Sequence, residues 1–206
     1  MEDLEKNSVR EFNSWAKNYD NPFNHFFFTH SNQAVVKLLS LTEVVSILDV
    51  GVGTGILIEL VLLKSKMVRL FGVDISPEMV KRARKKFQGN NNVVIDLGSA
   101  SKLPYKDNSF DFVTCSNSFH HYPNSFQSLK EMKRVLKQGG KVVLLDGCLD
   151  GIFRQIVFKT ENNINKEGKV YRYTKAQMKN LFNQVGFINI SQGYSFYFGL
   201  ITVGEK

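Results

Sequence analysis

Residues 47–55 constrain the fold of this chain more than any other segment. They read Ile-Leu-Asp-Val-Gly-Val-Gly-Thr-Gly, an apolar run that passes directly into three glycines at alternate positions. The pattern predicts a buried strand over residues 44–50 and a helix over residues 54–64, with the glycines in the turn between them. Glycine suits such a turn because the backbone must bend tightly and approach a ligand closely. A strand, a glycine-rich turn and a helix in this order are typical of a nucleotide-binding unit.

Strand and helix patterns alternate along the rest of the chain. Further strands are expected over residues 68–74, 93–97, 110–116, 141–146, 187–194 and 196–204, and further helices over residues 76–87, 124–137 and 174–185. Strands separated by helices form a mostly parallel sheet that is covered on both faces. The last two strands have only a short connection, which favours antiparallel pairing. We therefore predict a single α/β domain over residues 1–206, with a Rossmann-like, doubly wound sheet of seven strands.

The carboxyl ends of the strands are the expected position of the ligand, as in other open α/β sheets. The chemistry should therefore lie just after Val50, Asp74, Leu97, Ser116 and Asp146.

Two residues near the glycine turn indicate which nucleotide it suits. The dinucleotide pattern needs a glycine at position 56, where this chain has Ile56. Asp49 lies two residues before the first glycine, and its carboxylate is awkward beside a pyrophosphate but suits a ligand with ammonium and sulfonium groups. S-adenosylmethionine (SAM) carries both groups, and its carboxylate can use the N–H groups near a helix start.

Asp74 ends the next expected strand, 19 residues after Gly55. An acid in this place can accept hydrogen bonds from both hydroxyls of a ribose. Asp74 could instead cap the helix that follows, but Ser76 is already well placed for that role.

Several ordered motifs extend this pattern from about residue 45 to residue 146. They are Leu-Asp-Val-Gly-x-Gly-Thr-Gly at 48–55, Gly-Val-Asp-Ile-Ser at 72–76, Leu-Pro-Tyr at 103–105, Asn-Ser-Phe-Asp-Phe-Val at 108–113 and Arg-Val-Leu-Lys-x-Gly-Gly at 134–140. With these motifs the chain resembles the class I SAM-dependent methyltransferases, in particular the ubiquinone/menaquinone-biosynthesis type (methyltransferase type 11).

The resemblance implies a set of cofactor-binding residues. They are Tyr19, Asp49, Gly51, Gly53, Gly55, Asp74, Ile75, Ser99, Ala100, Ser116 and Asn117. Ile75 is expected to pack on the adenine, while Ser116 and Asn117 line the methionine half. The turn at 98–100 matches the place where relatives have Gly-Asp-Ala and hold the adenine. Ser99 replaces the acid there, which removes a charge from the adenine end.

His121, and after it His120, are the candidates for a catalytic base. They lie in the segment that follows the fourth strand of the motif region, which should face the transferred methyl group. A neutral histidine could remove a proton from the acceptor. The alternative is that both histidines only pack and form structural hydrogen bonds. Methyl transfer needs alignment of the acceptor more than it needs a protein nucleophile, and no zinc-ligand spacing is present, so we expect no metal.

Two segments outside the motif region are expected to enclose the substrate. Residues 1–30 contain a helical pattern that Pro22 interrupts and an aromatic run after it, and we expect them to act as a lid, unless they are an ordinary aromatic core. Residues 149–173 form a variable insertion on the substrate side.

Composition leaves several functions open. Lys and Arg exceed Asp and Glu by eight, and five basic residues are gathered at 81–86, either as a solvated helix face or as an anion-binding face. No apolar run reaches the roughly 18 residues of a membrane span, and the charged N-terminus is unlike a signal peptide, so we expect a cytoplasmic protein.

Among the possible methyl acceptors, a small molecule is favoured. The alternatives are an RNA or protein methyltransferase, a SAM-binding protein without catalysis and a nicotinamide oxidoreductase.

Overall fold

The computed structural model describes residues 9–10, 12–14, 21–41, 44–148, 150–151, 170–195 and 199–206. Its elements are α2 (Pro22–Val36), β1 (Val45–Val50), α3 (Ile56–Lys64), β2 (Val68–Asp74), α4 (Pro77–Lys86), β3 (Val93–Leu97), β4 (Phe110–Ser116), η1 (Phe119–His121), α5 (Ser125–Val135), β5 (Leu136–Gly147), α7 (Lys175–Val185), β6 (Ile188–Tyr194) and β7 (Gly199–Glu205). Among the helices of these residues, none combines the length and the apolarity that crossing a bilayer requires.

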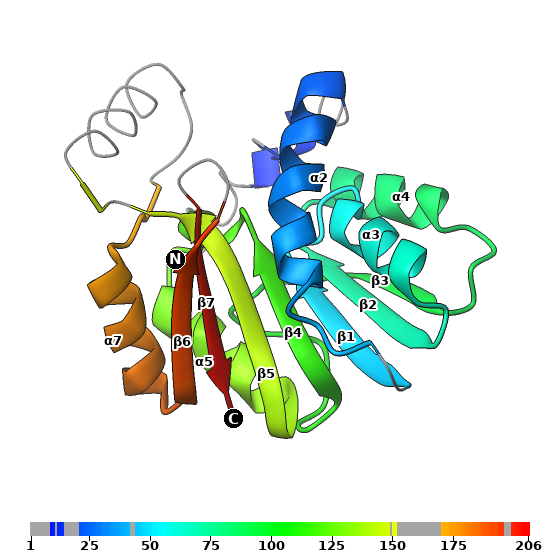
Figure 1. Ribbon diagram of the computed structural model, residues 1–206. Helices are drawn as coiled ribbons and strands as arrows, with labels where there is room; N and C mark the ends of the chain where they lie inside the picture. Colours follow the sequence, from blue (N-terminus) through cyan, green and yellow to red (C-terminus); the bar gives the residue numbers. More distant parts are fainter. Residues whose placement is uncertain are drawn as a thin grey trace.

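One sheet of seven strands organises the molecule, in the order β3-β2-β1-β4-β5-β7-β6 (Figure 1). Strands β1 to β5 run parallel to one another. Strand β7 runs antiparallel between β5 and β6. The predicted doubly wound, mostly parallel sheet with a C-terminal antiparallel strand is therefore confirmed.

Helices cover both faces of the sheet (Figure 1). Helices α2, α3 and α4 pack over one apolar cluster, and α5 and α7 over another. Ile47 belongs to the first cluster and Leu48 to the second, because consecutive side chains of a strand point to opposite faces. This burial on both sides explains why β1 is mostly apolar and why its last four residues are buried.

Helix α2 was not expected from the sequence, where Pro22 was interpreted only as the end of a preceding helix. The structure begins a new helix there. Pro22 occupies the first turn, where its missing N–H costs nothing, and the Asn21 side chain caps the helix by accepting a hydrogen bond from the Asn24 N–H at 2.9 Å. The aromatic run of residues 23–30 is therefore the first half of α2.

The boundary between α5 and β5 also differs from the prediction. The helix ends at Val135, not at residue 137, and β5 begins directly at Leu136. Leu136 is fully buried and pairs with Phe110 of β4. Pairing with the neighbouring strand and burial of this side chain outweigh the local helical pattern.

Candidate cofactor-binding and active site

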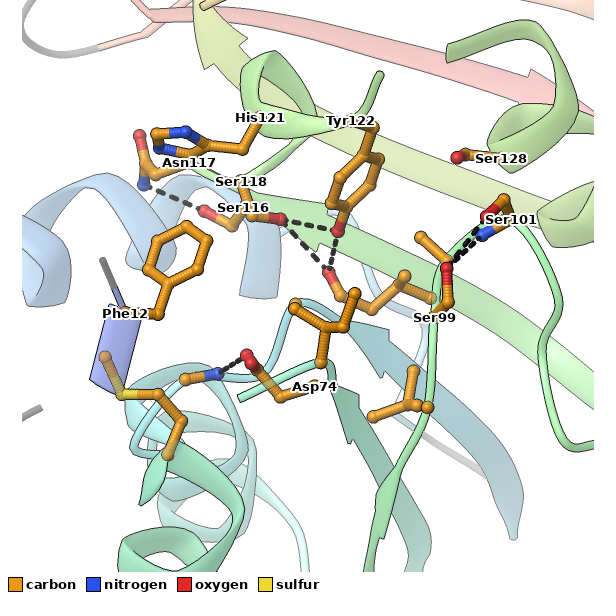
Figure 2. Close-up of a pocket in the computed structure, with 18 of the residues that line it drawn as sticks. Phe12, Asp74, Ser99, Ser101, Ser116, Asn117, Ser118, His121, Tyr122 and Ser128 are labelled. Carbon is orange, nitrogen blue, oxygen red and sulfur yellow. Dashed lines mark hydrogen bonds between the residues drawn. The ribbon is translucent and has the colours of Figure 1, made fainter. Parts of the chain in front are cut away.

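A cleft of about 750 Å³, counted to its open mouth, lies beyond the carboxyl ends of β1 to β4 (Figure 2). Its walls come from the ends of four strands and the turns that follow them, with single contributions from α4, α5 and the N-terminal segment. They include Val50, Gly51, Gly53, Val73, Asp74, Ile75, Met79, Ser99, Ala100, Ser101, Ser116, Asn117, Ser118, His121, Tyr122, Ser128 and Phe12. The position agrees with the ligand edge expected for a sheet of this kind.

Gly51 allows the chain to turn at the centre of the cleft. Its φ of +77° lies in the region that favours glycine. Its N–H donates to the Val73 carbonyl at 2.8 Å, which ties the turn to β2. A Cβ on Gly51 would lie 2.3 Å from Ser118 Oγ, so no larger residue fits.

Gly55 has a different role from the other two glycines of the turn. It is the N-cap of α3, with a φ of +87°, and a Cβ there would meet the Phe87 ring at 2.4 Å. Gly55 is not among the residues that line the cleft. The structure thus explains this glycine by close packing of α3 against the end of α4.

Asp74 holds the glycine turn and the start of α4 in place. One carboxylate oxygen accepts the Gly53 N–H and the other accepts the Ser76 N–H, both at 2.9 Å. The pKa of Asp74 is raised, because burial outweighs these backbone hydrogen bonds. Ser76, as expected, caps α4 by accepting the Met79 N–H. Asp74 is thereby left to face the cleft.

Asp49 lies behind the glycine turn and does not line the main cleft. It lines a hollow of about 310 Å³ beside it, together with Phe28, Asn32, Gly51, Val52, Thr54, Ile56, Leu57 and Ser116. Thr114 of the adjacent strand donates to Asp49 Oδ1 at 2.8 Å. Burial, aided by the charge of Asp74 and opposed by the Thr114 hydrogen bond, raises the pKa of Asp49 to about 7.

Ser118 and Tyr122 form a polar cluster at the end of β1 (Figure 2). Their hydroxyl oxygens are 2.9 Å apart, and each lies within hydrogen-bond distance of the Val50 carbonyl. Burial raises the pKa of the Tyr122 hydroxyl well above its ordinary value, so it stays protonated. The cluster fixes the segment after β4 against the end of β1.

The two candidate histidines occupy different environments. His121 lines the cleft, where its ring meets the Phe12 ring edge-on at 4.9 Å between centroids. Burial, reinforced by His120, lowers the pKa of His121 to about 3, so this ring is neutral at physiological pH. His120 is not part of the cleft lining.

His120 is held by Asp146 at the end of β5. Its Nδ1 lies 2.6 Å from Asp146 Oδ1, and its backbone N–H donates to Asp146 Oδ2 at 2.8 Å. Burial disfavours the charged form of Asp146, but His120 and the backbone hydrogen bonds outweigh it and lower the pKa of this carboxyl. The His120 carbonyl also accepts the Tyr171 N–H at 2.7 Å. These contacts fix the position of His120 and indicate a structural role.

The far end of the cleft is lined by the turn after β3. Ser99, Ala100 and Ser101 lie there, and the hydroxyl oxygens of the two serines are 2.8 Å apart. Ser99 thus contributes a hydroxyl, not a carboxylate, to this end of the cleft. Ile75, which was expected to contact adenine, lines the same cleft.

The N-terminal segment reaches the cleft through Phe12. The neighbouring Asn13 accepts a hydrogen bond from the Ser76 hydroxyl at 2.7 Å, which attaches this segment to the start of α4. Tyr19, predicted to touch the cofactor, lies outside the described residues, as do residues 149 and 152–169 of the expected insertion.

Several site residues were missed in the sequence analysis. Asn32, Thr114 and Asp146 carry no motif of their own, and they join the site only through packing and strand pairing. Thr114 could have been anticipated, because it is the register partner of Asp49 once β4 is placed beside β1. Ser118 and Tyr122 were harder to predict as site residues than Thr114, because only their place in the segment after β4 indicated the site.

The residues that line the cleft and the adjoining hollow fit SAM. Asp74 and the Ser99–Ser101 turn line one cavity, as a ribose with its attached adenine requires. The acidic Asp49 lies next to the same glycine turn, as a ligand with positive groups requires. Glycine at position 51 lets the turn pack closely against Ser118 and Tyr122 in the wall of the cleft.

Comparisons with known proteins show the family of the chain. Residues 48–144 match the family model described as a methyltransferase domain. The demethylmenaquinone methyltransferases of Staphylococcus aureus strains JH9 and Newman are each 31% identical to the chain, over 88% of its length and 85% of theirs.

Solved structures show the same fold. The chain that forms a complex with the Haloferax volcanii Trm112 methyltransferase activator has a TM-score of 0.83 at 22% identity, covering 95% of this chain and 97% of that one. A SAM-dependent methyltransferase of Thermotoga maritima, described as a possible histamine N-methyltransferase, has a TM-score of 0.78 at 22% identity, over 95% and 98% of the two chains. With the sequence relatives, these findings show that the chain belongs to the class I SAM-dependent methyltransferases of the ubiquinone/menaquinone-biosynthesis type.

Proposed function

We propose that this methyltransferase acts on a small-molecule acceptor, which lies in the cleft beside Phe12, His121 and Tyr122. The observation that carries the proposal is the composition of this wall, where a phenylalanine and a neutral histidine are in ring contact next to Asn117. Apolar and aromatic walls with a few polar groups are typical of small-molecule pockets. The similarity of the chain to demethylmenaquinone methyltransferases supports an acceptor of the quinone type.

The protein's own part in the reaction is alignment. SAM supplies a methyl group on a positively charged sulfur, and an in-line displacement transfers it to the acceptor. The residues of the cleft would orient the acceptor and exclude water, which accounts for much of the rate in reactions of this kind. Asp74 would hold the ribose, with Ile75, Ser99 and Ala100 around the adenine and Ser116 and Asn117 along the methionine half.

His121 fits an orienting role better than the role of a strong base. A group with a pKa of about 3 binds a proton weakly at neutral pH, which limits general-base catalysis. A neutral ring is nevertheless suited to a place near the sulfonium, because it adds no repelling charge. The ring contact with Phe12 would keep His121 in one orientation against the acceptor.

Replacement of His121 tests this role. We expect His121→Ala to lower turnover roughly 10- to 100-fold by loss of alignment, with the affinity for S-adenosylhomocysteine unchanged. His121→Phe should recover part of the turnover, because it restores a ring but no basic nitrogen. Steady-state assays with labelled SAM give both values, and His25→Ala on the exposed side of α2 is the matched control. Full activity of His121→Ala would remove His121 from the proposed site.

The acceptor class is tested in the same assay. Hydroquinones, catechols, phenols and amines are offered in parallel with total tRNA and rRNA at low and high salt. We expect methylation of one of the small molecules with little salt dependence. Methylation of RNA alone, with a rate that falls steeply as salt is raised, would contradict the proposal.

A further inference from the structure

Asn32 of α2 carries a polar atom that the fold leaves without a partner. The residue is 6% exposed, and its Oδ1 is buried with no hydrogen-bond partner among the described residues. A buried carbonyl oxygen without a partner is unfavourable, because it has given up its hydrogen bonds to water and gained none in return. A buried polar atom without a partner in a folded protein requires an explanation. One physical explanation is that a bound ligand donates a hydrogen bond to it.

The position of Asn32 indicates which ligand atom could reach it. Asn32 lines the hollow of about 310 Å³ that also contains Asp49. Gly51 and Ser116 line both this hollow and the main cleft, so the two cavities adjoin at the glycine turn. A ligand that extends along the cleft past Gly51 would therefore place its end between Asn32 and Asp49.

The chemistry of the hollow suits a positively charged donor. Asn32 offers an amide oxygen and Asp49 a carboxylate, while the remaining walls are mostly apolar side chains such as Phe28, Ile56 and Leu57. An ammonium group has three N–H donors and no acceptor, so it can satisfy both oxygens at once. A carboxylate or phosphate in the same place would face a like charge on Asp49.

We propose that Asn32 Oδ1 and the Asp49 carboxylate together bind the α-ammonium group of SAM, so that Asn32 makes the enzyme selective for adenosyl ligands with an amino-acid tail. The inference rests on SAM as the cofactor and is independent of the acceptor. Asn32 is a binding residue in this account and takes no part in the chemical step.

A second contact from α2 supports the assignment. Ser31, which precedes Asn32, accepts a hydrogen bond from Asn117 Nδ2 at 3.2 Å, and Asn117 lines the main cleft. Two consecutive side chains of α2 thus face the cofactor side of the sheet. Helix α2 also packs directly on α3, which begins at the glycine turn.

The test compares two ligands that differ in the tail. S-adenosylhomocysteine carries the α-ammonium group, and 5′-methylthioadenosine lacks the amino-acid portion. We expect Asn32→Leu to weaken S-adenosylhomocysteine at least about tenfold by calorimetry, as loss of a hydrogen bond to a charged group predicts. The affinity for 5′-methylthioadenosine should stay within about twofold of the unsubstituted protein. Gln33→Leu, at the exposed neighbouring position, is the matched control and should change neither affinity.

Thermal unfolding distinguishes a ligand-binding role of Asn32 from a merely structural role. Ligand-free Asn32→Leu should unfold at or above the temperature of the unsubstituted protein, because it removes an unpaired buried carbonyl. Asn32→Asp keeps an acceptor oxygen and should keep the preference for S-adenosylhomocysteine. Asn32→Ala replaces the leucine variant if that variant does not fold.

Two results would overturn the inference. In one, the leucine or alanine variant keeps the original ratio of the two affinities. In the other, both ligands weaken equally. Failure of the unsubstituted protein to bind S-adenosylhomocysteine would instead refute the cofactor assignment, and failure to methylate any small molecule would refute only the proposed acceptor class.

Discussion

At the scale of single residues, two buried carboxylates dominate the electrostatics of the site. Asp74 is stabilised by backbone N–H groups from two segments, whereas Asp49 has one hydroxyl partner and lies in an apolar setting. The pKa of Asp49, raised to about 7, means that this carboxyl is about half protonated in the free protein at pH 7 and mostly protonated below it. A bound cation would favour the ionised form, so ligand binding and ionisation of Asp49 should be coupled.

The affinity for S-adenosylhomocysteine should therefore depend on pH. Below pH 7 Asp49 is protonated, and a proton must leave before the carboxylate can pair with the ligand ammonium. The Kd should fall as pH rises from 5.5 to 7.5, by up to about tenfold per unit well below the pKa of about 7. Calorimetry in buffers of different ionisation enthalpy would also record the released proton.

Controls separate Asp49 from its neighbour Asp74, whose pKa is raised as well. The ribose is common to S-adenosylhomocysteine and 5′-methylthioadenosine, so a contribution from Asp74 affects both. The ratio of the two affinities should change with pH in the unsubstituted protein and be constant in Asp49→Asn. A ratio that does not change with pH in the unsubstituted protein would show that Asp49 does not pair with the tail.

Gly51 and Gly89 allow backbone strain to be separated from occlusion of the cleft. Both have positive φ, +77° and +83°, but a Cβ on Gly89 meets nothing within 4 Å. Gly89→Ala should cost about 1 kcal/mol of strain, a fall of a few degrees in Tm, and leave S-adenosylhomocysteine binding intact. Gly51→Ala adds the overlap with Ser118 and should abolish binding. Retained binding in a folded Gly51→Ala protein would show that the turn can yield.

At this scale, local motifs were predictable and tertiary partners were not. The glycine turn and Asp74 follow from a strand passing into a helix, which neighbouring residues determine. Thr114 meets Asp49 across 65 residues only because β4 pairs with β1. Asn32 reaches the site only through the packing of α2.

At the scale of elements, the N-terminal region differs from the prediction because it contains α2. Its aromatic first half was expected to cover the acceptor pocket, but among the described residues it is Phe12 that lines the main cleft, while Phe28 lines the adjacent hollow. The helix was missed because its apolar residues, spread around its circumference, have no clear amphipathic period. Asn21 followed by Pro22 is a recognisable helix start. The sequence pattern was instead interpreted as the end of a preceding helix.

Removal of residues 1–20 tests the lid at the N-terminus. This deletion keeps the Asn21 cap of α2 but removes Phe12 and Asn13, which contact His121 and Ser76. We expect the affinity for S-adenosylhomocysteine to fall roughly tenfold, in line with the loss of a cavity wall, while Tm falls by only a few degrees. Calorimetry and thermal unfolding measure both quantities. An unchanged affinity would refute the lid.

At the scale of the whole molecule, the alternation of strands and helices was sufficient to predict the sheet, because parallel strands need a long crossover connection, which is usually a helix. Element boundaries were less predictable, as Leu136 shows, since burial against a neighbouring strand decides them.

The basic residues at 81–86 form contacts within the fold in part. Arg84 donates to the Ile95 carbonyl, and Lys86 pairs with Glu59.

The central claim is that the cleft beyond β1 to β4 binds SAM through the glycine turn and Asp74. Calorimetric titration with S-adenosylhomocysteine, for the unsubstituted protein and for Asp74→Asn, tests it most directly. We expect one site per chain, and an affinity that falls roughly 10- to 100-fold in Asp74→Asn, as weakened hydrogen bonds from two ribose hydroxyls to a charged acceptor imply. Absence of binding to the unsubstituted protein, tight binding of NADH in its place, or full affinity in a folded Asp74→Asn variant would contradict it.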